Sequence, residues 1–89
     1  MRSEKAVIIN KLGLHARAAA KLVDTTARYQ SKIEITFNGK TVDGKSIMSV
    51  MLLAAGIGSE LEISASGHDE DRALEGVLEI IANRFGEEE

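Results

Sequence analysis

The chain has 89 residues and a formal net charge of -3, with 44% hydrophobic and only 3% aromatic residues. This size and composition support one compact core, so we expect a single domain over residues 1–89. The lack of cysteine excludes disulfide bonds and thiolate metal sites and favours a cytoplasmic location. The basic residues are dispersed and aromatic side chains are few, so we expect no nucleic-acid-binding surface. The apolar run before Asn10 is too short for a signal-peptide core or a membrane span.

The first third of the chain predicts a strand followed by a helix. Residues 4–10 contain a run of β-branched apolar side chains, which is typical of a strand shielded on both faces. Residues 16–28 carry apolar side chains at helical spacing, while charged residues fall off that stripe. The stripe that we expect to be buried consists of Ala16, Ala19, Ala20, Val23 and Ala27.

The next segment predicts a β-hairpin. Residues 32–37 alternate between apolar and polar side chains, which is the pattern of a half-buried strand. Asn38 and Gly39 tolerate the positive φ angles of a type I′ turn. A short partner strand is therefore expected at residues 40–42.

A short helix should follow this hairpin. Ser46 is well placed to cap a helix over residues 47–53, and Gly56 and Gly58 end it. Its side chains are apolar on almost every side. If Val50, Leu53 and Ala54 face the sheet, other apolar side chains point at least partly to solvent; burial on all sides is the alternative.

The last third predicts a strand and a long helix. Residues 60–66 alternate again, and the helix opens at Asp69 and stops at Gly86. Its acidic first turn suits the positive end of a helix dipole. The expected inward residues are Leu61, Ile63 and Ala65 on the strand and Leu74, Val77, Leu78, Ile81 and Phe85 on the helix.

The resulting order βαββαβα predicts an α+β fold. A central hairpin and three helices with an apolar side indicate an antiparallel sheet that the helices cover on one face. The other face of the sheet should be polar.

His15 is the first candidate for chemistry, because it lies where a loop becomes the helix over residues 16–28. The first amides of a helix have no intrahelical partner and suit a phosphoryl group. The positive helix end and the nearby Arg17 favour the neutral, nucleophilic form of the imidazole. Arg17 can then neutralise part of the phosphoryl charge. From spacing alone, a histidine with no task stays the simpler interpretation.

Other polar residues give weaker signals. Ser46 is a helix cap and also a potential phosphorylation acceptor. His68, with the acids that follow it, could form a metal-binding corner, but these acids are better explained by the helix dipole. No nucleotide loop or catalytic triad is present, so we expect neither an enzyme nor a cofactor or metal site.

Three segments together carry a family resemblance. They are Asn-Lys-Leu-Gly-Leu-His-Ala-Arg-Ala-Ala-Ala-Lys-Leu-Val at residues 10–23, Gly-Lys-Ser-Ile-Met at 44–48 and Ala-Ala-Gly-Ile-Gly at 54–58. Over essentially its whole length the chain resembles the HPr family, the histidine-containing phosphocarrier proteins of the bacterial phosphoenolpyruvate-dependent phosphotransferase system. The resemblance implies an open-faced β-sandwich of four antiparallel strands with three helices on one face.

The resemblance also implies a function for particular residues. His15 would carry the phosphoryl group on Nδ1, Arg17 would assist, and the amides of Ala16, Arg17 and Ala18 would hold the phosphate. The donor would be phosphorylated enzyme I and the acceptors enzyme IIA domains, with the chain acting as a monomer. Ser46 would be the regulatory site of a serine kinase and phosphorylase. The partner-docking residues would be Ala20, Ile47, Met48 and Met51.

Three positions depart from the common family pattern, and two of them bear on which pathway the chain would serve. Ala18 stands where many sugar-branch members have proline, and Leu12 where they have a small polar residue, so the active segment looks more like the nitrogen-related branch than sugar transport. Ser49 replaces a common glycine. Two alternatives to the relay are a regulatory binding module controlled at Ser46 and a structural adaptor that uses the helix over residues 47–53.

Overall fold

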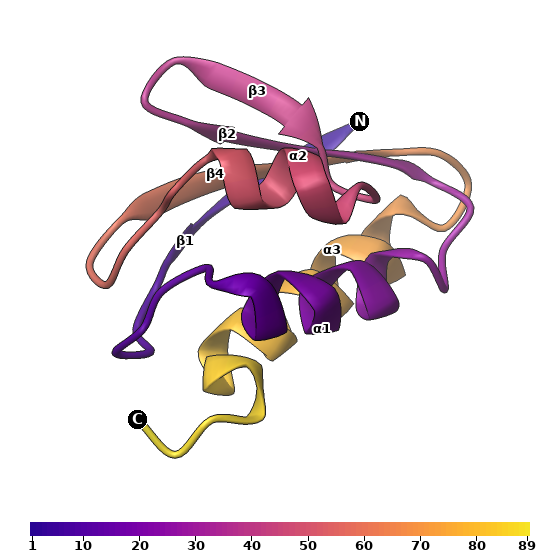
Figure 1. The fold of residues 1–89 in the computed structure, drawn as a ribbon. Coiled ribbons are helices and arrows are strands. Elements are labelled where there is room, and N and C mark those ends of the chain that lie inside the picture. Colours follow the sequence, from indigo (N-terminus) through magenta and orange to yellow (C-terminus); the bar gives the residue numbers. More distant parts are fainter.

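The computed structural model describes all 89 residues and confirms the predicted order of elements (Figure 1). The elements are β1 (Arg2–Val7), α1 (Ala16–Thr26), β2 (Lys32–Phe37), β3 (Lys40–Asp43), α2 (Ile47–Leu52), β4 (Glu60–Ser66), α3 (Glu70–Ala82) and a 3-10 turn (Arg84–Gly86). The four strands form one antiparallel sheet in the order β1-β4-β2-β3. None of the helices combines the length and the apolar character needed to cross a membrane.

The sheet has one apolar and one polar face, as predicted. On the inner face Ile35 lies opposite Ile63 across the pairing of β2 with β4, and both side chains are fully buried. On the outer face the hydroxyls of Ser3 and Ser64 are hydrogen bonded at 2.9 Å. The hairpin turn is also confirmed, because Asn38 and its glycine neighbour have φ angles of 54° and 78°.

The three helices lie on the inner face of the sheet (Figure 1). α1 contacts both α2 and α3, and α3 packs against β1 and β4. The core of 18 buried apolar residues lies between these helices and the sheet. The loop that leads into α1 and the C-terminal segment emerge close together at one end of this layer (Figure 1).

The first strand is confirmed, but its predicted bounds of residues 4–10 and its predicted burial on both faces are wrong. β1 spans Arg2–Val7, and only Ala6 in it is even partly buried. The strand lies at the edge of the sheet and pairs only with β4, so one of its sides has no neighbouring strand. Beyond the strand Ile8 is fully buried whereas Ile9 is exposed, which shows that the apolar run contributes to the core mainly after the strand ends.

The buried face of α1 also differs from the predicted stripe. Ala16, Ala20 and Ala27 are exposed, and the buried residues are Ala18, Ala19, Leu22, Thr25 and Thr26. Alanines lie on both the buried and the exposed side of this helix, so the spacing of apolar residues could not identify the packed face. Thr26 can be buried because its hydroxyl donates to the carbonyl of Gly44 at 2.8 Å.

The stripe of the last helix is confirmed in its centre. Leu74, Val77 and Ile81 are buried, whereas Leu78 is only partly buried. Phe85 is fully buried but lies beyond α3, in a turn where its φ angle is 55°. The helix therefore ends before Gly86, and the turn brings the last aromatic side chain back into the core.

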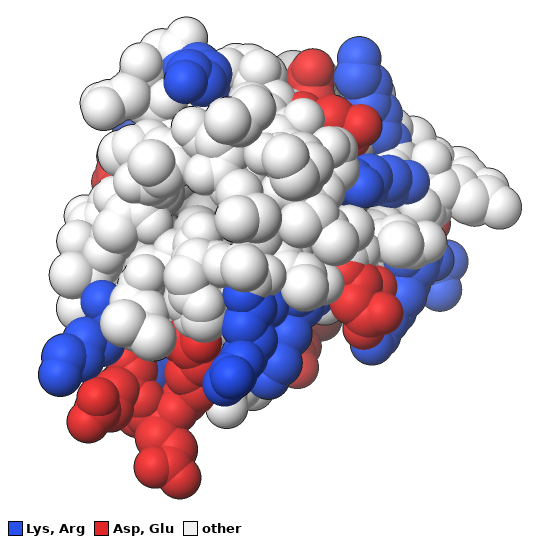
Figure 2. All heavy atoms as spheres, viewed as in Figure 1, with Lys and Arg blue, Asp and Glu red and all other residues white.

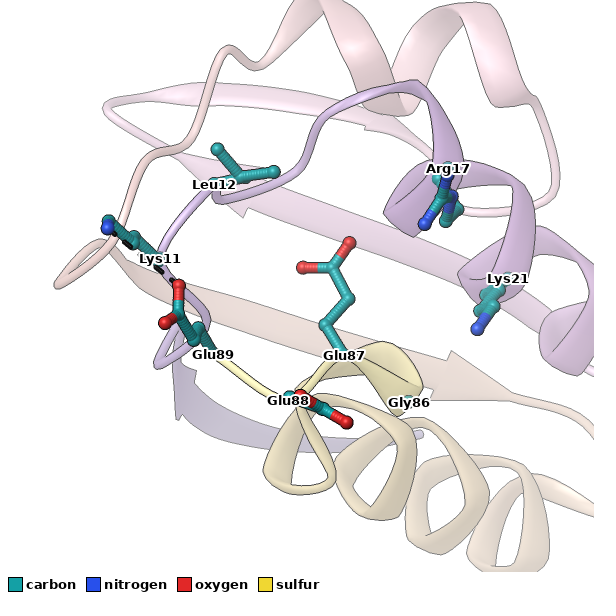
Figure 3. Close-up of a pocket in the computed structure, with 8 residues that line it drawn as sticks. All are labelled: Lys11, Leu12, Arg17, Lys21, Gly86, Glu87, Glu88 and Glu89. Carbon is teal, nitrogen blue, oxygen red and sulfur yellow. Dashed lines mark ion pairs between the residues drawn. The ribbon is translucent and has the colours of Figure 1, made fainter.

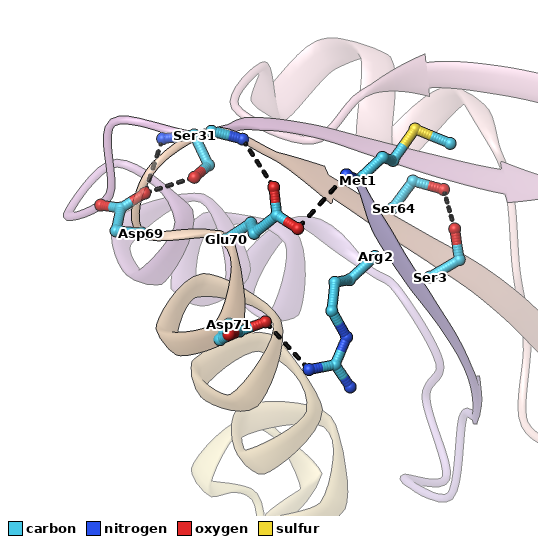
Figure 4. A network of polar contacts seen from close by, with 9 residues as sticks. Met1, Arg2, Ser3, Ser31, Ser64, Asp69, Glu70 and Asp71 are labelled. Carbon is cyan, nitrogen blue, oxygen red and sulfur yellow. Dashed lines mark hydrogen bonds and ion pairs between the residues drawn. The ribbon is translucent and has the colours of Figure 1, made fainter.

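The acidic residues at the start of α3 have specific partners that the helix-dipole explanation did not foresee (Figure 4). Asp69 accepts hydrogen bonds from the amide of Gln30 and the amide and hydroxyl of Ser31, and makes no side-chain cap. These hydrogen bonds lower the pKa of Asp69 to about 2. Glu70 pairs with the N-terminal amine of Met1 at 3.3 Å. The acids thus tie α3 to the loop after α1 and to the edge strand.

Candidate functional site

The loop before α1 is held by close backbone packing. Gly13 donates its amide to the carbonyl of Asn10 at 3.2 Å, and Leu14 donates to the carbonyl of Ala55 at 2.9 Å. Gly13 has a φ angle of 69°, and a Cβ atom there would lie 2.6 Å from the Ala55 oxygen. Only glycine combines this left-handed conformation with so close an approach. The loop is therefore fixed against the segment that follows α2.

This loop places His15 at the N-terminal end of α1. His15 is the N-cap residue, with extended backbone angles, but its side chain makes no capping hydrogen bond. The amides of Ala16, Arg17 and Ala18 take part in no hydrogen bond, as expected for the first turn of a helix. The ring is 28% exposed. The structure thus brings the ring, the unpaired amides and the first turn that carries Arg17 to one end of the helix.

Glu87 is a site residue that the sequence analysis missed. Its Oε2 contacts Nε2 of His15, and its Oε1 accepts a hydrogen bond of 2.9 Å from Nδ2 of Asn10. The pKa of Glu87 is lowered, chiefly by the Asn10 hydrogen bond and further by His15 and Arg17. Three consecutive glutamates at the end of the chain have no spacing that relates them to a histidine 72 residues away. No pattern in the sequence could have identified this contact.

The C-terminal segment and the start of α1 enclose a hollow of about 450 Å³ (Figure 3). Its basic side chains are Lys11, from the loop before α1, and Arg17 and Lys21, from α1 itself. Lys11 pairs with Glu89 at 3.7 Å. In Figure 3 the carboxylate of Glu87 points toward the turn that carries Arg17. The residues that line the hollow are Lys11, Leu12, Arg17, Lys21, Gly86, Glu87, Glu88 and Glu89. Bound anions would meet three cations here, in competition with the protein's own carboxylates.

An exposed apolar patch adjoins this site. Met48 of α2 is 71% exposed, and Ile47 and Met51 are exposed as well, so the alternative of burial on all sides is wrong. Ala20 of α1 is also exposed. The space-filling view shows a broad uncharged face over α2, with basic side chains below it in the region of α1 and acidic side chains gathered near the C-terminus (Figure 2).

The predicted buried side of α2 is confirmed only in part. Val50 and Leu53 are buried, but Ala54 is exposed and has a φ angle of 53°, because the helix ends before it. The exposed apolar surface is also larger than expected. It includes three residues that were not predicted to contribute to it, Leu12, Leu52 and Ile57.

The structure supports a capping role for Ser46 and shows no ligand-binding role for His68. The hydroxyl of Ser46 accepts a hydrogen bond from the amide of Ser49 at 3.3 Å, which confirms the predicted cap. His68 is exposed, and its neighbour Asp69 is turned toward Ser31. No group of three potential metal ligands occurs in the structure.

Comparison with known proteins places this site in a family. The family model described as "PTS HPr component phosphorylation site" matches residues 2–83. A phosphocarrier protein HPr of Cupriavidus necator is 52% identical over 89 residues, which is 100% of both chains. A crystal structure of HPr-C-His from Thermoanaerobacter tengcongensis has a TM-score of 0.96 at 39% identity and covers 100% of both chains. An HPr dimer from the same bacterium has a TM-score of 0.79 at 39% identity, over 98% of this chain and 100% of that one. The chain belongs to the HPr family of the phosphotransferase system, whose members are phosphocarriers and not enzymes.

Proposed function

We propose that this chain accepts a phosphoryl group on His15 from phosphorylated enzyme I and donates it to enzyme IIA domains in the cytoplasm. The observation that carries the proposal is a partly exposed imidazole at a helix start whose first three amides are unpaired. Such amides, together with the partial positive charge of the helix end, suit an anionic group. His15, the N-cap residue of this helix, supplies the nucleophile.

The chemistry follows from this placement. A nitrogen of the neutral ring attacks phosphorus in line with the bond to the donor's leaving atom. The transferred group is surrounded by the amides of Ala16, Arg17 and Ala18, and the exposed guanidinium of Arg17 can form two parallel hydrogen bonds to its oxygens. The same contacts hold the group until an acceptor docks.

Labelling tests this proposal directly. Incubation with enzyme I and labelled phosphoenolpyruvate should give a label that is lost in acid and retained in alkali. His15→Ala should lose the label completely. The matched control is His68→Ala, which removes the only other histidine and should be labelled like the wild-type chain. Label retained in His15→Ala would refute the assignment.

Docking is proposed to use the exposed apolar patch beside His15. Ala20, Ile47, Met48 and Met51 supply an uncharged surface, and the flexible methionines can adapt to more than one partner. Because this face must stay open to both donor and acceptor, we propose that the working form is a monomer. Sedimentation at working concentration tests that assignment, and a dimer that covers Met48 would contradict it.

A second function is proposed for Ser46, which lies directly before this patch. A phosphoryl group on its hydroxyl would place roughly two negative charges beside Ile47 and Met48 and would weaken the docking of a partner by desolvation and repulsion. Ser46→Asp should lower the affinity for enzyme I, whereas Ser66→Asp, on the exposed end of β4, should leave it unchanged. Equal affinity of Ser46→Asp and the wild-type chain would exclude this regulation.

A further inference from the structure

Glu87 is held in one position relative to the His15 ring by two partners. One carboxylate oxygen contacts Nε2 of His15, and the other accepts from Nδ2 of Asn10 at 2.9 Å. The same Nδ2 donates to the carbonyl of Gly13 at 2.8 Å, so both of its N–H groups are engaged. Asn10 is fully buried. The carboxylate is therefore anchored to the rigid turn before α1, although it comes from the end of the chain.

The orientation of the Asn10 amide follows from its neighbours. Its nitrogen faces two oxygen acceptors, and its own oxygen is buried without a partner. A reversed amide would bring Oδ1 against the Gly13 carbonyl and the Glu87 carboxylate, which offers no donor on either side. The buried oxygen without a partner costs free energy. In this orientation, however, both N–H groups of the Asn10 amide have acceptors.

This arrangement determines which nitrogen of His15 carries the proton. Hydrogen bonding from Asn10 and His15 lowers the pKa of Glu87, so its carboxylate is ionised near neutral pH. An ionised carboxylate only accepts hydrogen bonds, and therefore Nε2 of His15 must be the donor. A neutral imidazole has a single N–H group, so its Nδ1 is left with a free lone pair.

We propose that Glu87 is a positioning residue that holds His15 as the Nε2–H tautomer and so leaves Nδ1, the nitrogen that the family resemblance already implies, free to accept the phosphoryl group. The inference rests on the proposed relay function and assigns this chain's own C-terminal segment a role in it. The other charged residues that line the hollow are Lys11, Arg17, Lys21, Glu88 and Glu89. No hydrogen bond or ion pair joins any of these to the ring.

The transfer step gives Glu87 a second effect. The Nδ1 lone pair forms the bond to phosphorus, while the bond between phosphorus and the donor's leaving atom breaks and its electron pair leaves with that atom. The His15 ring then bears substituents on both nitrogens and is positively charged. Its Nε2 proton stays in the hydrogen bond to Glu87, whose negative charge offsets that of the ring. Release to the acceptor reverses these changes and returns the lone pair to Nδ1.

Nitrogen NMR of the full chain can test the tautomer without any phosphoryl donor. At a pH where the ring is neutral, the wild-type chain should show the two ring nitrogens of His15 as a single Nε2–H tautomer. Glu87→Ala should give shifts averaged between the two tautomers. Glu75→Ala is the control, because it removes an exposed acid of α3 that lies outside the hollow and has no ring contact, and it should match the wild type.

Phosphorylation provides the second readout. The rate of label transfer from enzyme I should fall about two- to fivefold in Glu87→Ala, the range expected for loss of a partly exposed charge pair, and should be unchanged in Glu75→Ala. Either wild-type ring shifts or a wild-type rate in Glu87→Ala would overturn the role of Glu87. Failure of the wild-type chain to be labelled on His15 would instead overturn the relay itself, so the two failures can be told apart.

Discussion

Leu14 donates its backbone amide to the carbonyl of Ala55 at 2.9 Å, and this bond joins the loop that carries His15 to the segment that follows α2. The preceding Gly13 lies against the same segment. A Cβ atom at Gly13 would also come within 2.7 Å of Gly56 Cα. Since backbone atoms occupy this space, no side chain can move aside to admit a methyl group.

Gly13→Ala should therefore destabilise the protein strongly. The left-handed φ angle of 69° costs an alanine about 1–2 kcal/mol, and the clash adds about 1–3 kcal/mol. Gly39→Ala is the matched control, because Gly39 has a similar φ angle of 78° but open space around it. Urea unfolding should show a clearly larger loss for Gly13→Ala. Equal losses would mean that the loop can shift without cost.

Asp69 should make the stability of the protein depend on pH in the acid range. Its pKa in the folded chain is about 2, below the ordinary value of 3.8, so the folded state binds fewer protons than the unfolded state between these values. The contribution of Asp69 to stability is complete above about pH 4 and is lost as the pH falls through about 2.

Denaturant unfolding at several pH values can isolate this contribution. Asp69→Asn should remove part of the decline in unfolding free energy between about pH 4 and pH 2. Asp24→Asn changes an exposed acid on α1 and should retain the wild-type dependence. A pH profile of Asp69→Asn identical to that of the wild type would contradict the assigned hydrogen bonds to Ser31.

Ser46 can be tested as a helix cap independently of any regulation. Ser46→Ala removes the acceptor for the Ser49 amide and should lower the unfolding free energy by about 0.5–2 kcal/mol. Ser66→Ala, at the exposed end of β4 and without a side-chain hydrogen bond, should change it by less than about 0.5 kcal/mol. A neutral Ser46→Ala would show that water replaces the cap.

Met48 provides a test of the docking patch that leaves the fold intact. Because Met48 is 71% exposed, Met48→Glu should alter stability by less than about 0.5 kcal/mol. Its affinity for enzyme I should fall at least about fivefold, the loss expected when an interface contact is worth 1 kcal/mol or more. Ala27→Glu changes an exposed residue at the end of α1 away from His15, and this variant should bind enzyme I normally. Normal binding by Met48→Glu would place docking elsewhere.

Much of this fold could be read from local patterns, because the features concerned depend on neighbouring residues. The turn at Asn38-Gly39 needs only backbone that tolerates positive φ angles, and the cap at Ser46 needs only a hydroxyl beside a free amide. The alternation along residues 60–66 shows which side chains share a face, since successive strand residues point to opposite sides. His15 was found in the same way, by its place before a helix and by the resemblance of its segment.

Contacts between distant segments could not be read in this way. Hydrophobicity shows that a strand or helix has apolar residues, but sheet order and packing against other elements decide which of them are covered, as at β1 and α1. Asp69 finds its partners 38 and 39 residues earlier, and Glu87 meets His15 across 72 residues. Such pairings depend on how the whole chain folds back on itself, and neither partner has local spacing that refers to the other.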